Sequence, residues 1–270
     1  MKTILVTGST DGIGRETARQ LGERGARVLV HGRTRAKAER AAQALRDETG
    51  RDAYDAVAGD FASLAEVRAL AADVLARHPR LDVLVNNAGI YATERGVSAD
   101  GFELTLAVNQ LAPFALTHLL IGAFGSGGRI VLVSSNVHGG VRALDFDDLD
   151  RTRGYDGYAA YADSKLMNVS TAFELARRLA DRGIAVNAMH PGVIGTKLLR
   201  RGFGAGGGAD VTRGAAGEVR LAIDPALDGV SGRYFDQTSE SRASSLASDV
   251  ALQARVYEMS IERTGVAPIA

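Results

Sequence analysis

Short apolar runs alternate with longer amphipathic stretches along almost the whole chain. The runs that we expect as strands cover residues 2–7, 27–32, 53–58, 81–85, 129–133, 184–189 and 232–235. Helical periodicity fills the segments 15–24, 36–48, 64–77, 100–124 and 158–182, and a terminal helix is expected at 244–263. Strands that alternate with helices build a parallel sheet with helices on both faces. No linker or further repeat interrupts the rhythm, so residues 1–270 are expected to form one α/β domain.

Composition excludes several classes of function. Lys plus Arg equals Asp plus Glu among the 270 residues, so the formal net charge is zero and no nucleic-acid partner is expected. The absence of cysteine excludes disulfides, cysteine nucleophiles and thiolate metal sites. The N-terminal apolar run is too short for a signal peptide or a membrane helix, and no later segment is expected to reach membrane length. We therefore expect a soluble, cytoplasmic protein with no membrane partner.

A glycine-rich turn joins the first expected strand to the first expected helix, with the spacing T-G-x-x-x-G-x-G. Glycines let the backbone approach a diphosphate closely, and the helix N-terminus adds free N–H groups and partial positive charge. A plain glycine turn is the alternative interpretation. The nucleotide interpretation assigns cofactor contacts to Gly8, Ser9, Thr10, Asp11, Gly12, Ile13 and Gly14.

The end of the second strand indicates which nucleotide is bound. NAD-binding units carry an acidic residue there for the ribose 2′-hydroxyl. This chain has Arg33-Thr34-Arg35 and no acid, and a guanidinium suits a 2′-phosphate. The prediction is NADP(H), with Arg33 as the main contact supported by Thr34 or Arg35. For Arg35 and Lys37 the alternative is a solvated helix start.

Two further strand ends complete the predicted cofactor site. Asp60 and Phe61 follow the third strand, where Asp60 either accepts a hydrogen bond from an adenine amino group or lies in a loop near the next helix. The fourth strand ends in small residues, and ligands of open α/β sheets lie at the carboxyl ends of the strands. The contacts predicted there are Asn87, Ala88 and Gly89.

Tyr161 and Lys165 are expected one turn apart on the helix at 158–182. A nearby ammonium favours the phenolate and lowers the pKa of the phenol. Such a phenol can give a proton to a carbonyl or take one from an alcohol. The spacing alone is common by chance, so the prediction depends on the motifs around it.

Five motifs in order resemble the short-chain dehydrogenase/reductase family over nearly the whole chain. They are Thr7-Gly8…Gly12-Ile13-Gly14, Asn86-Asn87-Ala88-Gly89, Asn109, Ser135 and Tyr161…Lys165. The resemblance implies a doubly wound, Rossmann-like sheet of about seven parallel strands with helices on both faces. It also implies a hydride transfer between a nicotinamide and a substrate carbon.

The resemblance assigns roles to a catalytic tetrad. Tyr161 is the acid/base, and Lys165 holds the nicotinamide ribose and lowers the pKa of Tyr161. Ser135 orients the substrate oxygen, and Asn109 holds a water that links Lys165 to solvent. Chemistry alone leaves Ser134 and Ser135 as alternatives, and the family pattern selects Ser135. The family's element near the nicotinamide amide falls on Pro191, Gly192, Val193 and Thr196.

A narrower similarity is to the retinol-dehydrogenase-like and WW-domain-oxidoreductase-like branch. It rests on residues 99–103, 134–138, 161–168 and 190–192, and on the long connection from Ser135 to Tyr161. That branch mostly uses NADP(H) on hydrophobic aldehydes, ketones or alcohols, but this chain lacks its membrane-anchoring N-terminal helix. The resemblance implies a small, apolar carbonyl or alcohol substrate and a homodimer or homotetramer packed through the long helices. The alternatives are a C=C reductase using the same site and a non-catalytic NADP(H) sensor.

The remaining candidates concern the substrate and metals. Five histidines show no metal-ligand spacing, and His138 is a candidate for the pocket wall. The acidic run at 145–150 is interpreted as a solvated loop, with a carboxylate metal site as the alternative, so no metal is predicted. A substrate loop is expected around 195–225, with its glycine-rich part at 202–208 as a lid.

Overall fold

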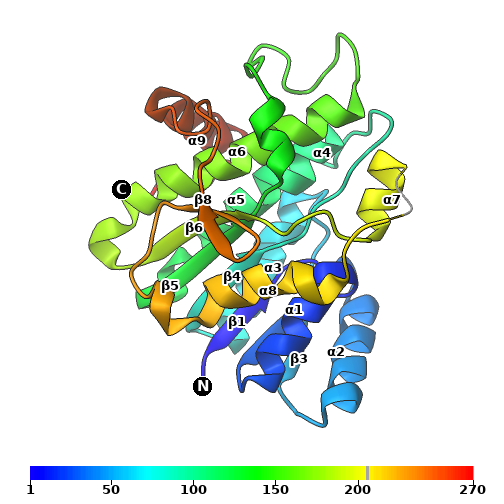
Figure 1. Ribbon diagram of the computed structural model, residues 1–270, viewed down its shortest axis with the longest axis vertical. Coiled ribbons are helices and arrows are strands. Elements are labelled where there is room, and N and C mark those ends of the chain that lie inside the picture. Colours follow the sequence, from blue (N-terminus) through cyan, green and yellow to red (C-terminus); the bar gives the residue numbers. More distant parts are fainter. Residues whose placement is uncertain (205–206, 270) are drawn as a thin grey trace.

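The computed structural model describes residues 1–204 and 207–269. Its centre is one sheet with the strand order β3-β2-β1-β4-β5-β6-β7-β8 (Figure 1). The strands are β1 (Thr3–Val6), β2 (Arg27–Gly32), β3 (Tyr54–Ala58), β4 (Leu81–Asn86), β5 (Phe124–Val133), β6 (Ala185–His190), β7 (Tyr234–Asp236) and β8 (Ser239–Ser241). The first seven pair in parallel, and β8 adds an antiparallel edge. The predicted Rossmann-like fold of about seven parallel strands is confirmed.

Alternating residues of the strands face two separate helix layers. Leu5 and Leu84 pack against α3 (Leu64–Arg77), α5 (Ala112–Leu120) and α6 (Gly157–Arg178). Ile4 and Val83 face the other way, against α1 (Gly12–Glu23), α2 (Arg35–Thr49) and α8 (Val211–Ile223). Both faces are buried, which explains why the strands read as continuous apolar runs.

Strands β1 and β4 are neighbours in the middle of the sheet, and from them the strand order runs outward in opposite directions. The connection from β1 runs to β2, and the chain returns from β3 to place β4 on the other side of β1. The crevice at the carboxyl ends of such neighbouring strands is where ligands bind in open α/β sheets. The glycine turn after β1 and the Asn-rich end of β4 meet there.

The helix expected at 100–124 is interrupted. It consists of α4 (Leu104–Leu106), a π-helical turn (Ala107–Leu111), α5 and a 3-10 turn (Ile121–Ala123), and Phe124 already belongs to β5. Pro113 has no N–H for the carbonyl of Asn109, so a regular α-helix cannot continue through this point.

The expectation that no segment reaches membrane length was wrong for this stretch. Leu104–Ala123 is long and apolar enough to cross a membrane, but 83% of its most apolar window is buried inside the protein. Its hydropathy is accounted for by its place in the core, between the sheet and the C-terminal helix.

The C-terminal region differs from the prediction in two ways. The last helix, α9, spans Val250–Thr264 and begins six residues later than expected, and β8 was not predicted. The shorter helices are α7 (Lys197–Phe203) and the 3-10 turns Asn136–Gly140, Ala180–Arg182 and Pro225–Leu227. Strand β8 has three exposed residues and no apolar pattern, so periodicity could not reveal it.

Helix α9 covers the side of α5 and α6 that faces away from the sheet. Tyr257 of α9 accepts a cation–π contact from Arg178, whose guanidinium lies 3.9 Å from the ring centroid, and its hydroxyl lies 3.2 Å from His118 Nε2. Fifteen of the 22 residues of α6 are buried. The oligomer packed through the long helices, which the resemblance implies, stays a prediction.

Candidate active site

The glycine turn is shaped by contacts that exclude any side chain. A Cβ at Gly14 would lie 2.6 Å from the Gly8 carbonyl oxygen and would clash with Asn87 Nδ2. Gly8 has a φ of +64°, and a Cβ there would lie 2.9 Å from Ala88 Cα. The turn after β1 is therefore pressed against the end of β4, and a glycine is required at both positions.

Side chains from three strands hold this turn in place. Asn87 Nδ2 donates to the carbonyl of Thr7 at 2.8 Å, and Thr7 Oγ1 accepts from the N–H groups of Asn87 and Ala88 at 3.0 Å. His31 Nδ1 accepts from the Gly8 N–H at 3.0 Å, so its Nε2–H donates to the Gly59 carbonyl at 3.0 Å. Burial lowers the pKa of His31 to about 4, which keeps the imidazole neutral.

These interactions show how Ser9 is held and add two residues that sequence analysis missed. The Ser9 side chain is fully buried, and its hydroxyl donates to the Val6 carbonyl at 2.7 Å and accepts from the His31 N–H. The Ser9 side chain therefore shapes the turn from inside, and the predicted contact of Ser9 with the cofactor stays a prediction. Thr7 and His31 were missed because their partners lie in other strands.

The remaining residues of the turn face neighbouring elements of the crevice. Asp11 caps α1, Thr10 lies against the end of β2 near Gly32, and Ile13 packs against Gly214 of α8. Gly12 has a φ of +57° and lies next to Thr196 of the segment after β6. Of the three glycines, Gly12 is the one at which an added Cβ would meet only Thr196, at 3.7 Å, so the backbone at the start of α1 is open there to a diphosphate.

At the adenosine end, the three residues after β2 have different partners. The Arg33 side chain is exposed and has no hydrogen bond or ion pair to any residue in 1–204 or 207–269. Thr34 caps α2, and Arg35 is engaged by the Ala56 carbonyl at 2.7 Å and by Asp73 at 3.1 Å. Of the two arginines in this stretch, Arg33 is the one whose guanidinium is available to a ligand.

The third-strand contacts have partly structural roles. Asp60 Oδ1 accepts from the Ala62 N–H at 3.0 Å, while Ser63 caps the next helix. Phe61 is 4% exposed and stacks at 4.8 Å on His31. Asp60 keeps its second oxygen for a ligand, and Phe61 supports the floor of the crevice.

The structure brings all four residues of the predicted tetrad together beside this crevice. Tyr161 and Lys165 face the carboxyl ends of β4 and β5, with the Lys165 Nζ 5.5 Å from the Tyr161 ring centroid. Ser135 follows β5 and is hydrogen-bonded to Tyr161. Gly89, just after β4, lies close to the tetrad, since a Cβ there would lie 3.4 Å from Asn109 Oδ1 and 3.5 Å from Lys165 Nζ.

The two adjacent serines point in opposite directions. Ser134 Oγ donates to the Lys165 carbonyl at 2.7 Å and thereby ties β5 to the helix that carries Tyr161. Ser135 is left facing the phenol, and its Oγ lies 3.5 Å from Asn136 Oδ1. The geometry favours Ser135 as the substrate-facing hydroxyl.

Asn109 fixes the loop after β4. Its Nδ2 donates to the Ile90 carbonyl at 2.9 Å and its Oδ1 accepts from the Ile90 N–H at 2.8 Å. Its backbone carbonyl accepts from Asn168 Nδ2 at 2.8 Å. Asn168 was not among the predicted site residues.

The expected lowering of the Tyr161 pKa is not found. Burial raises the pKa of Tyr161 to about 12, and the hydrogen bond with Ser135 opposes that rise only in part. Burial also lowers the pKa of Lys165 to about 8. Both groups are less than 7% exposed, so desolvation acts against the charged form of each.

Residues 194–204 and 207–209, which contain the described part of the predicted lid, are joined at their base. Ile194 and Ala209 pair, with Gly195 N–H donating to the Ala209 carbonyl at 3.0 Å, and Gly208 packs against Gly195. Between them, α7 places Lys197 in an ion pair with Asp11, and a Cβ at Gly202 would lie 2.6 Å from the Tyr91 ring. Helix α7 therefore extends from the glycine turn towards Tyr91, whose ring centroid is 5.5 Å from that of Tyr161 (Figure 1).

The predicted substrate-loop region of 195–225 contains two helices, and its contact with substrate stays a prediction. Residues from Val211 form α8, which packs on α1. Within the predicted glycine-rich part at 202–208, residues 205 and 206 lie outside the described residues. Pro191 and Gly192 begin the segment that follows β6. Gly192 has a φ of +96°, and Val193 after it is 56% exposed.

The other sequence candidates have structural partners. His138 is 4% exposed, accepts from the Ser244 N–H at 3.1 Å through Nε2, and therefore donates from Nδ1 to the Ser135 carbonyl at 2.7 Å. It supports Ser135 from behind. In the acidic run, Asp148 accepts from Thr152 and Arg153, and Asp150 pairs with Arg263 at 2.7 Å. Across the described part of the chain, no cluster of three or more His, Asp or Glu has metal-binding geometry.

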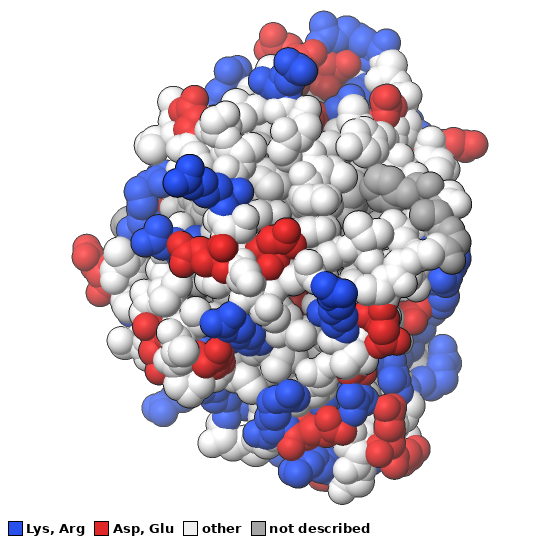
Figure 2. Space-filling view, viewed as in Figure 1, with Lys and Arg blue, Asp and Glu red and all other residues white. Residues whose placement is uncertain are grey.

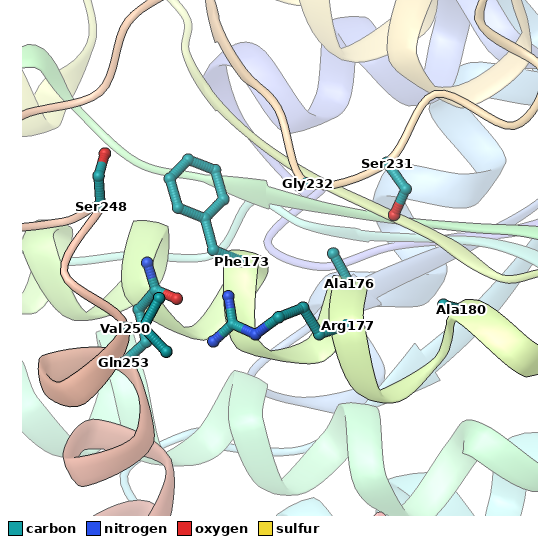
Figure 3. A pocket seen from close by; sticks show the side chains of 9 residues that line it. All are labelled: Phe173, Ala176, Arg177, Ala180, Ser231, Gly232, Ser248, Val250 and Gln253. Atoms are coloured by element: carbon teal, nitrogen blue, oxygen red, sulfur yellow. The ribbon is translucent and has the colours of Figure 1, made fainter.

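Two features of the surface complete the description: the distribution of charge and a hollow beside α6. Figure 2 shows that Lys, Arg, Asp and Glu side chains crowd the lower part of the view, whereas the middle of its upper half carries fewer of them. A hollow of about 390 Å³ lies between α6, residues 231–232 and the start of α9 (Figure 3). Its first lining residue on α6, Phe173, is eight positions after Lys165, or about 12 Å along the helix axis, so it is separate from the tetrad.

Comparison with known proteins decides the family. The model of the short chain dehydrogenase family matches residues 2–203. The chain belongs to the short-chain dehydrogenase family. It is 38% identical to human retinol dehydrogenase 14 over 98% of this chain and 87% of that protein. It is also 38% identical to mouse polyprenol dehydrogenase, over 98% of this chain and 84% of that protein.

Solved structures share the fold of this chain. A protein from Mycobacterium paratuberculosis superposes with a TM-score of 0.83 at 31% identity, covering 98% of this chain and 94% of that one. A 3-ketoacyl-(acyl-carrier-protein) reductase from Brucella melitensis solved with NADH gives 0.70 at 28%, with 87% and 96% covered. A metagenomic blue fluorescent protein solved with NADPH gives 0.69 at 28%, with 87% and 95% covered. This short-chain dehydrogenase is therefore an oxidoreductase of the retinol-dehydrogenase-like branch.

Proposed function

We propose that this enzyme is an NADP(H)-dependent oxidoreductase that interconverts an alcohol and a carbonyl on a small, apolar substrate, with Tyr161 as the proton donor and acceptor. The observation that carries the proposal is the convergence of Tyr161, Ser135 and Lys165 on the edge of the glycine-lined crevice. A nicotinamide bound there would supply or accept the hydride.

The residues of this site have complementary tasks in that reaction. The hydroxyls of Tyr161 and Ser135 hold the substrate oxygen, where negative charge develops as hydride reaches a carbonyl carbon. Tyr161 then gives its proton to that oxygen, and in the reverse direction it takes the proton of the alcohol. The Lys165 ammonium lies beneath the ring and favours the phenolate left after proton donation.

The raised pKa of Tyr161 has a consequence for direction. A buried phenol whose pKa is about 12 is protonated at neutral pH, which is the form needed to reduce a carbonyl. Oxidation of an alcohol needs the phenolate, so its rate should rise with pH. We infer that carbonyl reduction is the faster direction at neutral pH.

Specificity for NADP(H) is inferred from the adenosine end. Arg33 is the exposed guanidinium after β2 without a protein partner in the described chain, and the strand end carries no acid to bind a 2′-hydroxyl. The structural relatives include complexes with NADH and with NADPH, so the family leaves this choice to local residues.

An apolar substrate is inferred from the surface and from the relatives. Val193 and Tyr158, which neighbour the predicted site residues in the chain, are apolar or aromatic side chains that are 56% and 47% exposed. The named activities of the two relatives concern retinol and polyprenol, which are both apolar alcohols. Apolar aldehydes, ketones and alcohols form the class to test first.

The proposal is tested with Tyr161→Phe against a panel of apolar aldehydes and ketones with NADPH. We expect turnover to fall by about a hundredfold to ten-thousandfold, because the general acid is lost. Tyr158→Phe, one helical turn earlier on α6, is the matched control and should keep turnover. Near-parental activity of Tyr161→Phe would refute the assigned role.

Product analysis separates the alternatives. A saturated product from an α,β-unsaturated substrate with its carbonyl retained would identify a C=C reductase. Tight NADPH binding without oxidation on any carbonyl would identify a sensor. The intact tetrad favours an enzyme, since nucleotide sensing does not require a phenol and an ammonium beside each other.

A further inference from the structure

Lys165 is a buried cation whose hydrogen-bond acceptors are neutral, while the buried Glu218 of α8 acts on it through charge alone. It is 4% exposed, and its Nζ donates to the Val133 carbonyl at 2.9 Å and to Asn168 Oδ1 at 3.3 Å. None of the ion pairs found within 1–204 and 207–269 involves Lys165. Asn168 therefore supplies the side-chain acceptor for this ammonium.

The other end of the Asn168 amide fills a gap that Pro113 creates. In an α-helix the carbonyl of residue 109 accepts from the N–H of residue 113, and proline has no N–H. The Asn109 carbonyl instead accepts from Asn168 Nδ2 at 2.8 Å, where the chain forms its π-helical turn. One amide thus connects Lys165 with the interrupted helix that carries Asn109.

The orientation of this amide is fixed by a relay from the C-terminal helix. The Ser260 hydroxyl donates to the Val256 carbonyl at 2.8 Å, so it accepts from Gln110 Nε2 at 3.1 Å. Gln110 Oε1 must then face Asn168 Nδ2, at 3.1 Å. Because Asn168 Nδ2 is held by two acceptors, its oxygen is the atom that faces Lys165.

We propose that Asn168 is a positioning residue, which holds the Lys165 ammonium through a neutral oxygen and anchors it to the Asn109 carbonyl. This inference rests on the function proposed for Tyr161 and Lys165. A neutral acceptor orients the ammonium without cancelling its charge, so the charge remains available to the phenolate. A carboxylate at the same position would orient Lys165 equally well but would neutralise it.

That difference defines the test. Asn168→Asp keeps the size of the side chain and places a carboxylate next to Lys165 Nζ. Below pH 8, where Lys165 of the parent is charged, the pH profile of alcohol oxidation should move to higher pH by about one unit, because a paired ammonium stabilises the phenolate less. Asn168→Leu removes both hydrogen bonds, and turnover should fall by about tenfold while the profile moves in the same direction.

The measurements use the full-length enzyme with NADP⁺ and farnesol as the apolar alcohol. Titration of phenolate by ultraviolet absorbance, taken as the difference between each protein and its Tyr161→Phe counterpart, reports Tyr161 without substrate. Ser170→Ala is the control, because Ser170 is buried on the same helix and its hydroxyl has no partner in the structure. Its pH profile should match that of the parent.

Gln110→Leu provides a second route if the Asn168 variants fail to fold. It removes the group that orients the Asn168 amide and leaves Lys165 and Asn168 in place, so a smaller upward shift is expected. Unchanged pH profiles and phenolate titrations in folded Asn168→Asp and Gln110→Leu would overturn the role of Asn168. If Tyr161→Phe remained active, the proposed function itself would fail, whatever the Asn168 variants did.

Discussion

On the β1–β4 side of the crevice the turn is held by buried hydrogen bonds, whereas on the β6 side the lid is held by an exposed ion pair and a glycine contact. Thr7, His31 and Asn87 each bind backbone atoms of other strands at 2.8–3.0 Å. Lys197 and Asp11 form an ion pair with side chains 72% and 60% exposed. The first set resists local opening, while the second permits it.

The two regions therefore suit different tasks. A diphosphate is the same in every dinucleotide, so its cradle benefits from being rigid before the ligand arrives. A substrate must enter and leave, and α7 is held by the pairing of Ile194 with Ala209, by the exposed ion pair of Lys197 and by the contact of Gly202 with Tyr91. Substitutions in the glycine turn should therefore have large effects on cofactor binding and stability, whereas substitutions in the lid should have small ones.

Gly14→Ala should produce the largest effect. The added methyl would press on the Gly8 carbonyl and on Asn87, which cannot move without breaking the bonds to Thr7. NADPH binding, followed by the change in its fluorescence, should be lost. The free energy of unfolding should fall by about 1–3 kcal/mol, as for other overpacked sites.

Gly122→Ala is the matched control for this change. A Cβ at Gly122 meets no atom within 4 Å, and its φ is not in the left-handed region. Stability should change by less than about 0.5 kcal/mol. Normal NADPH binding by Gly14→Ala would show that the turn is less tightly held than the lid, which reverses the comparison.

The next largest effect should be a loss of stability at low pH on the β1–β4 side of the crevice. The folded-state pKa of His31 is about 4, below its usual 6.5, because the buried ring is neutral. Its contribution to stability is therefore complete above pH 6.5 and is lost as the pH falls towards 4. Between pH 7 and pH 5, the parent should lose about 2 kcal/mol more than His31→Gln, which cannot titrate.

The comparison with His31→Gln is needed because another buried group titrates with the opposite sign. Burial raises the pKa of Glu218 to about 8, so its contribution is greatest at low pH and is lost as the pH rises. Urea unfolding of both proteins at pH 7 and pH 5 cancels this shared term. Equal losses in the two proteins would mean that His31 does not hold the turn as a neutral ring.

Arg33→Ala tests the exposed end of the cofactor side. The efficiency with NADPH relative to NADH should fall by between about tenfold and about a hundredfold, the range for a hydrogen bond to a charged group. Arg35→Ala is the control, because Arg35 is bound to Asp73 and Ala56. An unchanged ratio for Arg33→Ala would remove the argument for a 2′-phosphate.

The contrast between the two regions also explains what the sequence could predict. The glycines and the Tyr161–Lys165 pair have local causes, namely a turn geometry and one turn of helix, so their spacing is visible in the chain. His31 joins residues 8 and 59, and Asn168 joins Lys165 to residues 109 and 110, through contacts up to 59 positions apart. Only the folded sheet shows these partners.

Pro113 is the one local feature that bears on the second group. A proline four residues after Asn109 leaves the Asn109 carbonyl without its helical partner, but the residue that takes up that carbonyl lies on α6 and cannot be found by periodicity. The rise in the pKa of Tyr161 was missed for a related reason. The spacing of Tyr161 and Lys165 predicts proximity, whereas the desolvation that outweighs it depends on the packing of the whole site.

The smallest expected effect belongs to the lid. Lys197→Ala removes the ion pair that joins α7 to Asp11, and exposed pairs contribute little. The rate of NADPH release, measured by stopped-flow fluorescence, should rise by less than about fivefold at low salt. The difference from the parent should disappear at high salt, because the screening length shortens. Lys2→Ala is the control, because Lys2 is an exposed lysine remote in sequence from α7, and it should leave the rate of NADPH release unchanged. A large increase that persists in high salt would mean that the lid is held as firmly as the turn, and that the two sides of the crevice open together.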